Sequence, residues 1–320
     1  MILTKCPLRI SLVGGSTDNP KFLEKYGSGE VISFPSNLYC YATIHRDING
    51  INANGGKFIV NYSVREECNS VEDIKNDIVR EVLKYFNCWT PLTISLTSDI
   101  SSSGSGLASS SAYVMALVAG MCKFKNLNVT DDMICETACE IERCINPLVG
   151  LQDFYGSITG GLKRITFKSI YDDYIRTSVS TYTNFRILEC NPLFLIHTGV
   201  QRASTDVLKT LNLQKCKELL KDVESLDRAI TEDNYDNFID TITQSWENKK
   251  KTSKDINKNR NVQKIDKFLN DLGYPHKLCG AGNGGYFFVI GDRSFRNKYT
   301  LTNNLIEIKI NEKGLEIFNV

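Results

Sequence analysis

Apolar residues gather in several short segments that predict β-strands in the first half of the chain. Leu8–Val13, Val31–His45 and Pro91–Thr97 are rich in β-branched and aromatic residues, and turn-forming residues lie between them. Asn-Gly and Asn-Gly-Gly within Asp47–Lys57 predict a turn that leads into a strand over Phe58–Tyr62. The pattern therefore predicts a sheet that contains hairpins.

Other segments repeat apolar residues with the spacing of a helix. Tyr113–Cys122 is apolar throughout, which predicts a buried helix, and Asp131–Ile145 carries Ile and Ala on one face. Ser70 followed by Asp73 predicts the start of a helix that continues to about Phe86.

The second half of the chain has longer amphipathic segments. The change to these longer segments follows a Gly160-Gly161 break and a strand over Leu162–Phe167. The Lys- and Asn-rich stretch Asn248–Asn261 is interpreted as a solvated connection. The elements expected beyond residue 170 are a strand pair near Phe185–His197, helices over Ala203–Ile230, Asn234–Lys250 and Val262–Leu272, and a strand over Tyr286–Ile290.

Length and composition favour a globular protein of two domains. The 320 residues are 42% hydrophobic and 23% charged. Because strands and helices alternate irregularly, an α+β fold suits the pattern better than a doubly wound parallel sheet. We place an N-terminal domain at residues 1–170 and a C-terminal domain at residues 171–320, where the pattern changes.

Charge and cysteine content restrict the partners and the compartment. The net charge of +1 gives no electrostatic support for a nucleic-acid partner. The N-terminus lacks a signal-peptide pattern, and the most apolar helix is too short to cross a bilayer. Eleven irregularly spaced cysteines are typical of buried thiols in a reducing compartment. We expect a cytoplasmic protein with no membrane or nucleic-acid partner, and the sequence carries no indication of its oligomeric state.

The segment Ser101–Ala112 carries the strongest chemical signal. Its glycines let the backbone turn N–H groups toward a ligand, and the positive end of the following helix dipole points to the same place. Such a junction binds phosphate, although a plain Ser/Gly loop is the alternative. The residues expected to contact a nucleotide phosphate are Ser103, Gly104, Ser105, Gly106, Leu107, Ala108, Ser109 and Ser110.

Several familiar nucleotide signatures are missing from the sequence. There is no Gly-x-x-x-x-Gly-Lys-Ser/Thr, and Asp153-Phe154 is followed by Tyr155 instead of the glycine of protein kinases. The run from Gly104 also lacks the third glycine of a dinucleotide-binding fingerprint. P-loop, protein-kinase and nicotinamide chemistry are therefore disfavoured.

Three ordered motifs together resemble a known superfamily. They are Pro7-Leu8-Arg9-Ile10-Ser11-Leu12-Val13-Gly14-Gly15-Ser16-Thr17-Asp18, the Gly104–Ser111 loop, and Gly280-Ala281-Gly282-Asn283-Gly284-Gly285-Tyr286-Phe287. In this order the chain resembles the GHMP kinases, small-molecule kinases that include galactokinase, homoserine kinase, mevalonate kinase and phosphomevalonate kinase. Gly-Gly-Ser-Thr-Asp, with Ile141-Glu142-Arg143 ahead of Gln152-Asp153, looks most like the D-glycero-D-manno-heptose 7-phosphate kinases, followed by the fucokinases.

The resemblance implies a fold and a reaction. An N-terminal domain like the second domain of ribosomal protein S5 and a ferredoxin-like C-terminal domain would bind ATP and a sugar between them. The expected reaction is ATP-dependent phosphorylation of the anomeric hydroxyl of D-glycero-D-manno-heptose 7-phosphate to the 1,7-bisphosphate. One alternative is a 1-kinase for another sugar, such as fucose or a hexose, and a second is a sugar and ATP sensor without catalysis. Retention of Arg9, Ser110, Glu142 and Asp153 argues against the sensor.

The same resemblance assigns catalytic and substrate-binding roles. Asp153 matches a general base, and Arg9 matches the cation beside it, which lowers the pKa of the acceptor hydroxyl and neutralises the transferring phosphoryl group. The structural alternatives are a loop cap for Asp153 and a salt bridge at a strand end for Arg9. The residues expected at the substrate are Asp18, Gly14, Gly15 and Gly282. For Asp18 the alternative is a turn residue.

A magnesium site is also implied by the resemblance. Ser110 matches the loop hydroxyl that contacts Mg²⁺, and Glu142 matches the helical carboxylate that completes the site. Mg²⁺ needs few protein oxygens when phosphate and water supply the others. The alternative for Glu142 is a solvent-facing carboxylate, which is the interpretation of Glu140.

Two positions depart from the family pattern, and one requirement has no motif. Ala108 and Asn283 each replace a glycine. A Cβ at position 108 is harmless only if φ is negative, whereas Asn tolerates left-handed backbone better than most residues. A 7-phosphate on the acceptor would need a cation distant from the reacting hydroxyl. The candidates are Arg46, Lys163, Arg164 and Arg202.

Overall fold

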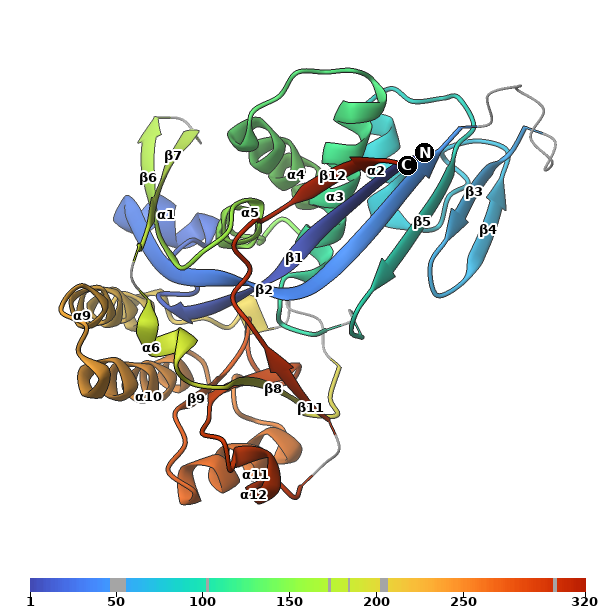
Figure 1. Cartoon of the computed structure of the whole chain (residues 1–320). Coiled ribbons are helices and arrows are strands. Elements are labelled where there is room, and N and C mark those ends of the chain that lie inside the picture. The colour runs from blue at the N-terminus through green and yellow to red at the C-terminus, as the bar shows by residue number, and fades with distance from the viewer. Residues whose placement is uncertain (47–55, 102–103, 172–173, 184, 202–206, 302–303) are drawn as a thin grey trace.

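Two β-sheets are formed by the residues that the computed structural model describes, which are all but 47–55, 102–103, 172–173, 184, 202–206 and 302–303 (Figure 1). The strands are β1 Ile2–Val13, β2 Ser28–His45, β3 Phe58–Asn61, β4 Arg65–Cys68, β5 Thr93–Ser98, β6 Lys163–Tyr171, β7 Tyr174–Thr181, β8 Leu193–His197, β9 His276–Leu278, β10 Tyr286–Ile290, β11 Leu305–Ile308 and β12 Glu316–Asn319. The helices are α1 Pro20–Tyr26, α2 Asp77–Tyr85, α3 Ser109–Phe124, α4 Asp131–Ile145, α5 Gln152–Ile158, α6 Arg186–Glu189, α8 Leu213–Cys216, α9 Leu219–Thr231, α10 Tyr235–Thr252, α11 Arg260–Asp271 and α12 Phe295–Lys298.

The first sheet is organised around the long strand β2. The strand order is β12-β1-β2-β5-β3-β4, and β6 also pairs with β2 and with β7. Residues Ser28–Ser33 of β2 pair with β6, whereas Cys40–His45 pair with β5, so β2 changes partner along its length. These pairings are antiparallel, and β3 with β5 is parallel.

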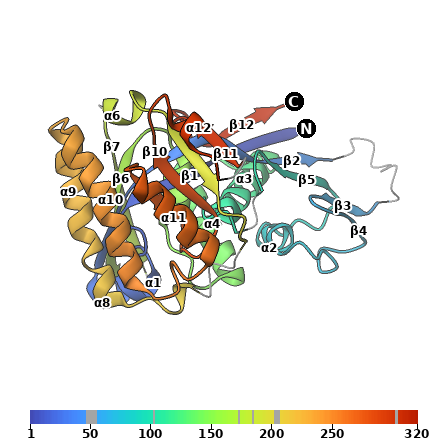
Figure 2. The same ribbon diagram turned by 90° about the horizontal axis from the view of Figure 1, so that it is seen from below.

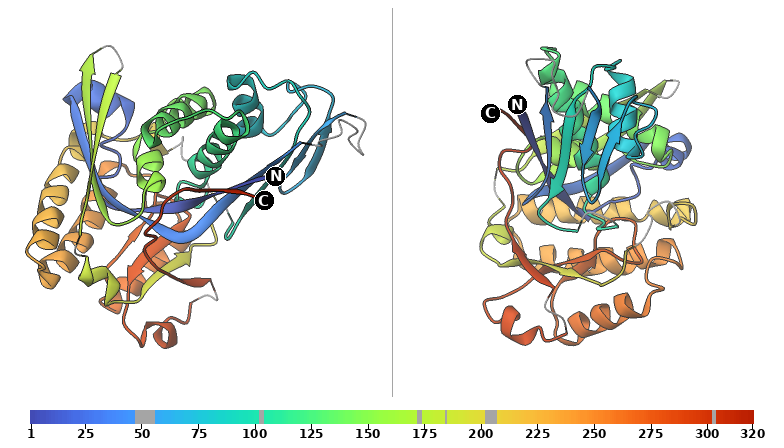
Figure 3. Two further views of the ribbon diagram at one scale, coloured as in Figure 1. Left: turned by 45° about the horizontal axis from the view of Figure 1, so that its top comes forward. Right: turned by 90° about the vertical axis from the view of Figure 1, so that its right-hand side faces the viewer.

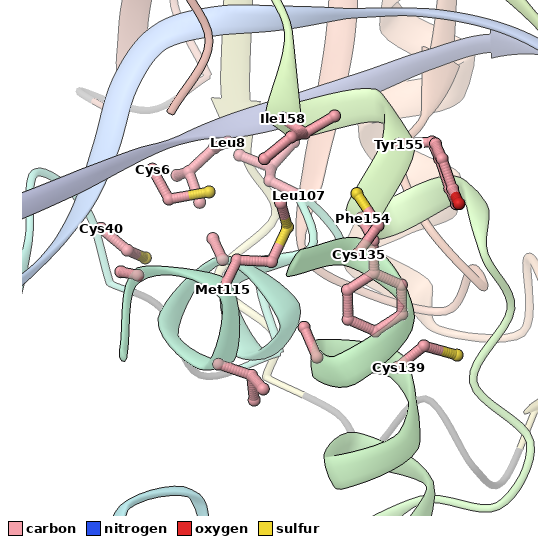
Figure 4. Packing of buried hydrophobic residues seen from close by; sticks show 14 of the residues in the cluster. Cys6, Leu8, Cys40, Leu107, Met115, Cys135, Cys139, Phe154, Tyr155 and Ile158 are labelled. Atoms are coloured by element: carbon pink, nitrogen blue, oxygen red, sulfur yellow. The ribbon is translucent and has the colours of Figure 1, made fainter. Parts of the chain in front are cut away.

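Helices α3, α4 and α5 pack together beside the long strands of this sheet. Val114–Cys122 of α3 is buried, as the apolar run of the sequence predicts. Figure 4 shows Met115 of this helix among Leu8 of β1, Leu107 and Phe154 of α5. This core fixes the start of α3 and the start of α5, both of which border the candidate site described below.

The second sheet is smaller and antiparallel, with strand order β11-β8-β10-β9. Helices α9 and α10 lie alongside one another, as seen from below in Figure 2. Asp266 of α11 is buried and joins three elements, because it accepts hydrogen bonds from Trp246 Nε1 at 2.6 Å, Lys250 Nζ at 3.0 Å and His276 Nε2 at 2.9 Å. The network ties α10 and α11 to β9, whose residue Lys277 reaches the site.

A single domain boundary along the chain does not separate the two sheets. Strand β7, beyond residue 170, pairs with β6, and β12 pairs with β1 with Ile2 opposite Asn319. The chain therefore crosses to the second sheet and returns, and both ends of the sequence lie side by side (Figure 3). A boundary at residue 170 stays a prediction about domains, while the first sheet itself extends past it.

The structure corrects three of the predicted elements. Ser70 and Asp73 form a turn, and α2 begins only at Asp77, because Glu66 accepts hydrogen bonds from the backbone N–H groups of Lys75 and Asn76. The expected strand pair near residues 185–197 is the short helix α6 followed by the single strand β8. The described part of the expected helix over residues 203–230 is two helices, α8 and α9.

Burial of the thiols agrees with the sequence analysis. All eleven cysteines are free, and only Cys144 and Cys190 are exposed. In the part of the chain that the structure describes, none of the helices has the length and apolar character needed to cross a membrane.

Candidate active site

A cleft of about 390 Å³ collects most of the residues singled out in the sequence. Two of its walls are the phosphate loop, residues 104–111, and the acceptor loop, residues 14–19. The predicted residues that line it are Arg9, Gly14, Gly15, Asp18, Gly104, Ser105, Gly106, Ala108, Ser109, Ser110, Glu142 and Asp153. Leu107 is buried in the core instead. Gly282 packs closely against Ile256, because a Cβ on Gly282 would lie 2.8 Å from Ile256 Cγ2. Ser103 lies outside the described residues.

The phosphate loop leads directly into α3 with its backbone N–H groups available. Gly104 and Gly106 have φ values of 65° and 77°, which are left-handed. The Ser105 and Ser109 hydroxyls lie 2.8 Å apart, and Ser105 Oγ accepts from Leu107 N at 3.2 Å. No side chain caps α3. The first turn therefore presents unsatisfied N–H donors at the positive end of a long helix, an arrangement that binds phosphate.

The third glycine motif supports this loop from behind. Tyr286 N donates to Ser105 O at 3.1 Å. A Cβ on Gly285 would lie 2.3 Å from Ser105 O, and one on Gly106 would lie 2.5 Å from Cys279 O. Only glycine permits these approaches, so the motif contributes support to the loop, as expected from the sequence.

Both departures from the family pattern occupy left-handed backbone. Ala108 has φ 63° and Asn283 has φ 62°. The conformation costs an alanine about 1–2 kcal/mol and costs an asparagine less. The Asn283 side chain also accepts from Asn259 N at 3.0 Å, which holds its loop in place. The left-handed requirement at position 108, which the sequence left open, is therefore met with strain.

Arg9 and Asp153 form an ion pair on the floor of the cleft. Arg9 Nε donates to Asp153 Oδ1 at 2.9 Å and Arg9 Nη2 donates to the same oxygen at 2.5 Å, while Arg9 Nη1 donates to Gly106 O at 3.1 Å. The Arg9 side chain is 4% exposed and that of Asp153 is 20% exposed. Asp153 thus keeps an accessible edge, and the arginine links it to the phosphate loop.

Asp18 is buried and is held by Gln152, a residue that the sequence analysis did not assign. Asp18 Oδ1 accepts from Gln152 Nε2 at 2.8 Å, and Oδ2 accepts from Gln152 N at 3.1 Å. Burial and the charge of Asp153 raise the pKa of Asp18 to about 6. The Gln152 Oε1 and Ser11 Oγ atoms have no hydrogen-bond partner among the described residues. Both line the cleft, where hydroxyl groups of a ligand would satisfy them.

Glu142 is buried beside the first turn of α3. It is 3% exposed, and its Oε2 lacks a hydrogen-bond partner in the described part of the chain. Burial raises the pKa of Glu142 to about 7, and the hydroxyls of Ser111 and Ser110 oppose that rise. A buried, unpartnered carboxylate next to a serine hydroxyl fits the oxygen ligands that Mg²⁺ prefers. The solvent-facing interpretation is wrong for Glu142 and correct for Glu140, which is exposed.

The three described cations among those proposed for an acceptor phosphate do not line the cleft. Arg46 is exposed beyond β2, and Lys163 is buried, where it donates to the Gly156 and Thr159 carbonyls. Arg164 is paired with Glu30 and Asp227. Arg202 lies outside the described residues.

Two unpredicted lysines line the cleft instead. Lys249 of α10 and Lys277 of β9 are each 7% exposed. Lys249 falls within the stretch interpreted as a solvated connection, and this interpretation is wrong because Lys249, Thr252 and Ile256 are buried. One signal was available, since Lys249 follows the buried Ile242 and Trp246 at helical spacing.

Comparison with known proteins finds one family domain in the chain and several similar kinases. Residues 74–161 match the model of the GHMP kinases N terminal domain. A D-glycero-alpha-D-manno-heptose 7-phosphate kinase of Campylobacter jejuni is 28% identical over 98% of this chain and 94% of that protein. An L-fucokinase/L-fucose-1-P guanylyltransferase of Bacteroides fragilis is 20% identical, over 98% of this chain and 38% of its own length.

The fold agrees with these similarities. The crystal structure of a D-glycero-D-manno-heptose 1-phosphate kinase from Bacteroides thetaiotaomicron matches with a TM-score of 0.72 at 17% identity, covering 100% of this chain and 99% of that chain. Its three motifs gather at one cleft, and the chain is similar to GHMP kinases over nearly its whole length. It is an ATP-dependent sugar kinase.

Proposed function

We propose that this protein transfers the γ-phosphoryl group of ATP to the anomeric hydroxyl of D-glycero-D-manno-heptose 7-phosphate and releases the 1,7-bisphosphate and ADP. The observation that carries the proposal is the Arg9–Asp153 pair, which lies in the same cleft as the phosphate loop and the acceptor loop. The similarity to a heptose 7-phosphate kinase along nearly the full length of both chains supports this choice of acceptor.

Asp153 is the proposed general base. As the anomeric oxygen forms its bond to the γ-phosphorus, the hydroxyl proton moves to the accessible carboxylate of Asp153. The bond from the γ-phosphorus to the β–γ bridging oxygen breaks, and ADP leaves with that electron pair. Arg9 holds the Asp153 carboxylate in its orientation, and its positive charge opposes the charge that develops on the transferring group.

The phosphate loop and two oxygen ligands are proposed to hold the nucleotide. The N–H groups of the first turn of α3 would bind ATP phosphates. Ser110 and Glu142 would hold Mg²⁺, and the orphaned Oε2 of Glu142 is the observation that fits such an ion. When bound, Mg²⁺ supplies charge neutralisation on the phosphate oxygens.

Asp18, Gln152 and Ser11 are proposed to bind the sugar. Gln152 fixes the Asp18 carboxylate, so its oxygens can accept from sugar hydroxyls without rotating. A Cβ on Gly14 would lie 2.0 Å from Glu30 O, so this glycine permits the close approach of the acceptor loop to β2, and a Cβ on Gly15 would lie 3.2 Å from Ser11 Oγ at the proposed sugar site. The supply of ATP and the free thiols support a cytoplasmic location for this reaction.

A second candidate is a 1-kinase for another sugar, and the similarity to the bifunctional L-fucokinase supports it. A screen of ADP release with Mg-ATP separates the two. We expect heptose 7-phosphate to give the highest kcat/KM, and ³¹P NMR to show a new anomeric phosphate. Higher kcat/KM with fucose or a free hexose would move the assignment to the second candidate. Absence of turnover with every acceptor would instead favour a sensor.

A further inference from the structure

Positive charge gathers at the acceptor side of the cleft. Among the described residues, the Lys and Arg side chains that line the cleft are Arg9, Lys249 and Lys277. Arg9 is committed to Asp153 and the phosphate loop. The two lysines lie in the C-terminal half of the chain, on α10 and β9. They take no part in the pairing of Arg9 with Asp153.

The ammonium group of Lys249 contacts the acceptor loop, and that of Lys277 contacts the end of β1 just before this loop. Lys249 Nζ donates to Gly15 O at 2.8 Å and to Ser16 Oγ at 2.5 Å. Lys277 Nζ donates to Leu12 O at 2.8 Å. These contacts fix where the two charges lie, and they are made with the acceptor-loop segment, not with residues 104–111.

The charge on Lys277 has no ion-pair partner in the described part of the chain. The charged groups that face it are Arg9 of β1, Lys249 of α10, Asp222 of α9 and the Cys279 thiol. Asp222 is itself bound by Asn248 Nδ2 at 2.9 Å. Burial, Lys249 and Arg9 lower the pKa of Lys277 to about 7. Burial of an ammonium group is costly unless an anion compensates it.

We propose that Lys249 and Lys277 bind the phosphate group of a phosphorylated acceptor sugar, which makes them the specificity-determining residues of the acceptor site. The inference rests on the proposed function, because it names the residues that distinguish a sugar phosphate from a free sugar. A phosphate dianion offers several acceptor oxygens to two ammonium groups, and such charge-assisted hydrogen bonds are the strongest available to it.

Two substitutions and a matched control test the assignment. Lys249→Met and Lys277→Met remove the charge and keep most of the side-chain volume, and Lys251→Met alters an exposed lysine of the same helix. For each variant, kcat/KM is measured with heptose 7-phosphate and with unphosphorylated heptose, and KM is measured for ATP. We expect each cleft variant to lose about 10- to 100-fold in kcat/KM for the phosphorylated sugar, mainly through KM. Any loss in kcat/KM for the free sugar should be smaller, because it has no phosphate to bind. The KM of ATP should change less than about twofold, and Lys251→Met should match the wild type.

Inorganic phosphate provides a readout that does not depend on turnover of a particular sugar. In the wild type it should compete with the phosphorylated acceptor and not with ATP, and the competition should weaken in both cleft variants. Equal losses for both sugars would show that the lysines only position the acceptor loop, and a selective rise in the KM of ATP would assign them to the donor. Either result overturns the inference.

The inference and the proposed function can fail separately. If the wild type ignores heptose 7-phosphate but another sugar phosphate suffers the selective loss in the variants, the proposed acceptor is wrong and the phosphate site stands. If the wild type prefers heptose 7-phosphate and the variants lose both sugars equally, the acceptor stands and the phosphate site is wrong.

Discussion

Arg9 and Asp153 lie 144 positions apart in the chain, yet the Arg9 Nε and the Asp153 Oδ1 meet at 2.9 Å. The contact exists because α5 packs on β1: a Cβ on Gly156 of α5 would lie 3.2 Å from Arg9 Cβ. Glycine at that position lets the helix approach the strand closely enough for the pair to form. The close approach of α5 to β1 thus determines the geometry of the Arg9–Asp153 pair.

Substitution of Asp153 by asparagine should reduce turnover without unfolding the protein. The variant keeps the shape of the side chain but removes the proton acceptor and its charge. We expect kcat to fall by about 10²–10⁴-fold, with little change in the KM of ATP. Steady-state kinetics check this, with Asp240→Asn on the exposed face of α10 as the control. A kcat close to that of the wild type would remove Asp153 from the proton transfer, leaving positioning and Arg9 to carry the reaction.

Loss of either proposed magnesium ligand should raise the metal requirement. We expect Ser110→Ala and Glu142→Gln each to increase the Mg²⁺ concentration that gives the half-maximal rate, because each removes an oxygen ligand. Titration of Mg²⁺ at saturating ATP and acceptor measures the effect. Glu140→Gln is the matched control, since Glu140 is exposed on the same helix. If Glu142→Gln follows the wild-type titration curve, Glu142 is not a ligand.

Relief of the left-handed strain at position 108 should stabilise the protein. Glycine adopts the φ of 63° seen there without a Cβ clash. We expect Ala108→Gly to raise the free energy of unfolding by about 0.5–1 kcal/mol, which is the strain relieved less the added freedom of the unfolded chain. Denaturant unfolding measures the change. Ala112→Gly, inside α3, should lower the same quantity by about 1 kcal/mol or more. A loss of stability in both variants would show that position 108 is unstrained.

Ionisation of Asp18 should make acceptor binding sensitive to pH. Burial and the charge of Asp153 raise its pKa to about 6. Above that pH the carboxylate accepts hydrogen bonds from Gln152 and from a sugar, and below it one oxygen is protonated. At saturating Mg-ATP, the KM of the acceptor should therefore rise as the pH falls through about 6. Asp18→Asn should have a raised acceptor KM that varies less over this range than that of the wild type, and a wild-type profile in this variant would exclude Asp18.

The elements that local sequence patterns specify were predicted well. The apolar run of α3, the glycines of the phosphate loop and the extent of α4 depend on neighbours in the chain, and they appear where the sequence indicates. The start of α2 was misplaced because Glu66, on the preceding strand β4, accepts hydrogen bonds from the backbone N–H groups of Lys75 and Asn76. Such a competition cannot be detected from helical periodicity alone.

The residues of the candidate site likewise divide into those predicted from local motifs and those that depend on tertiary packing. Arg9, Asp153, Ser110 and Glu142 were found because motifs surround them, and all four line the cleft. Lys249 and Lys277 were missed because they reach the cleft only when α10 and β9 dock against the acceptor loop. A lysine in a charged stretch is usually solvated. Only the position of Lys249 on the buried face of α10 distinguishes this residue from a solvated lysine. Gln152 was noted as part of a motif, but its contact with Asp18 depends on the placement of α5.

The pairing of β12 with β1 determines an order of assembly. A ribosome makes Ile2–Lys5 long before their partner strand, Glu316–Asn319, which leaves the exit tunnel only after both helices α9 and α10 and the whole second sheet. Throughout translation, the nascent first sheet keeps the backbone N–H and C=O groups of β1 open along one edge, a template for pairing with other chains. A transcript truncated shortly before residue 316 would yield every residue of the cleft together with an edge that nothing closes, so such a product would aggregate despite its intact active-site sequence.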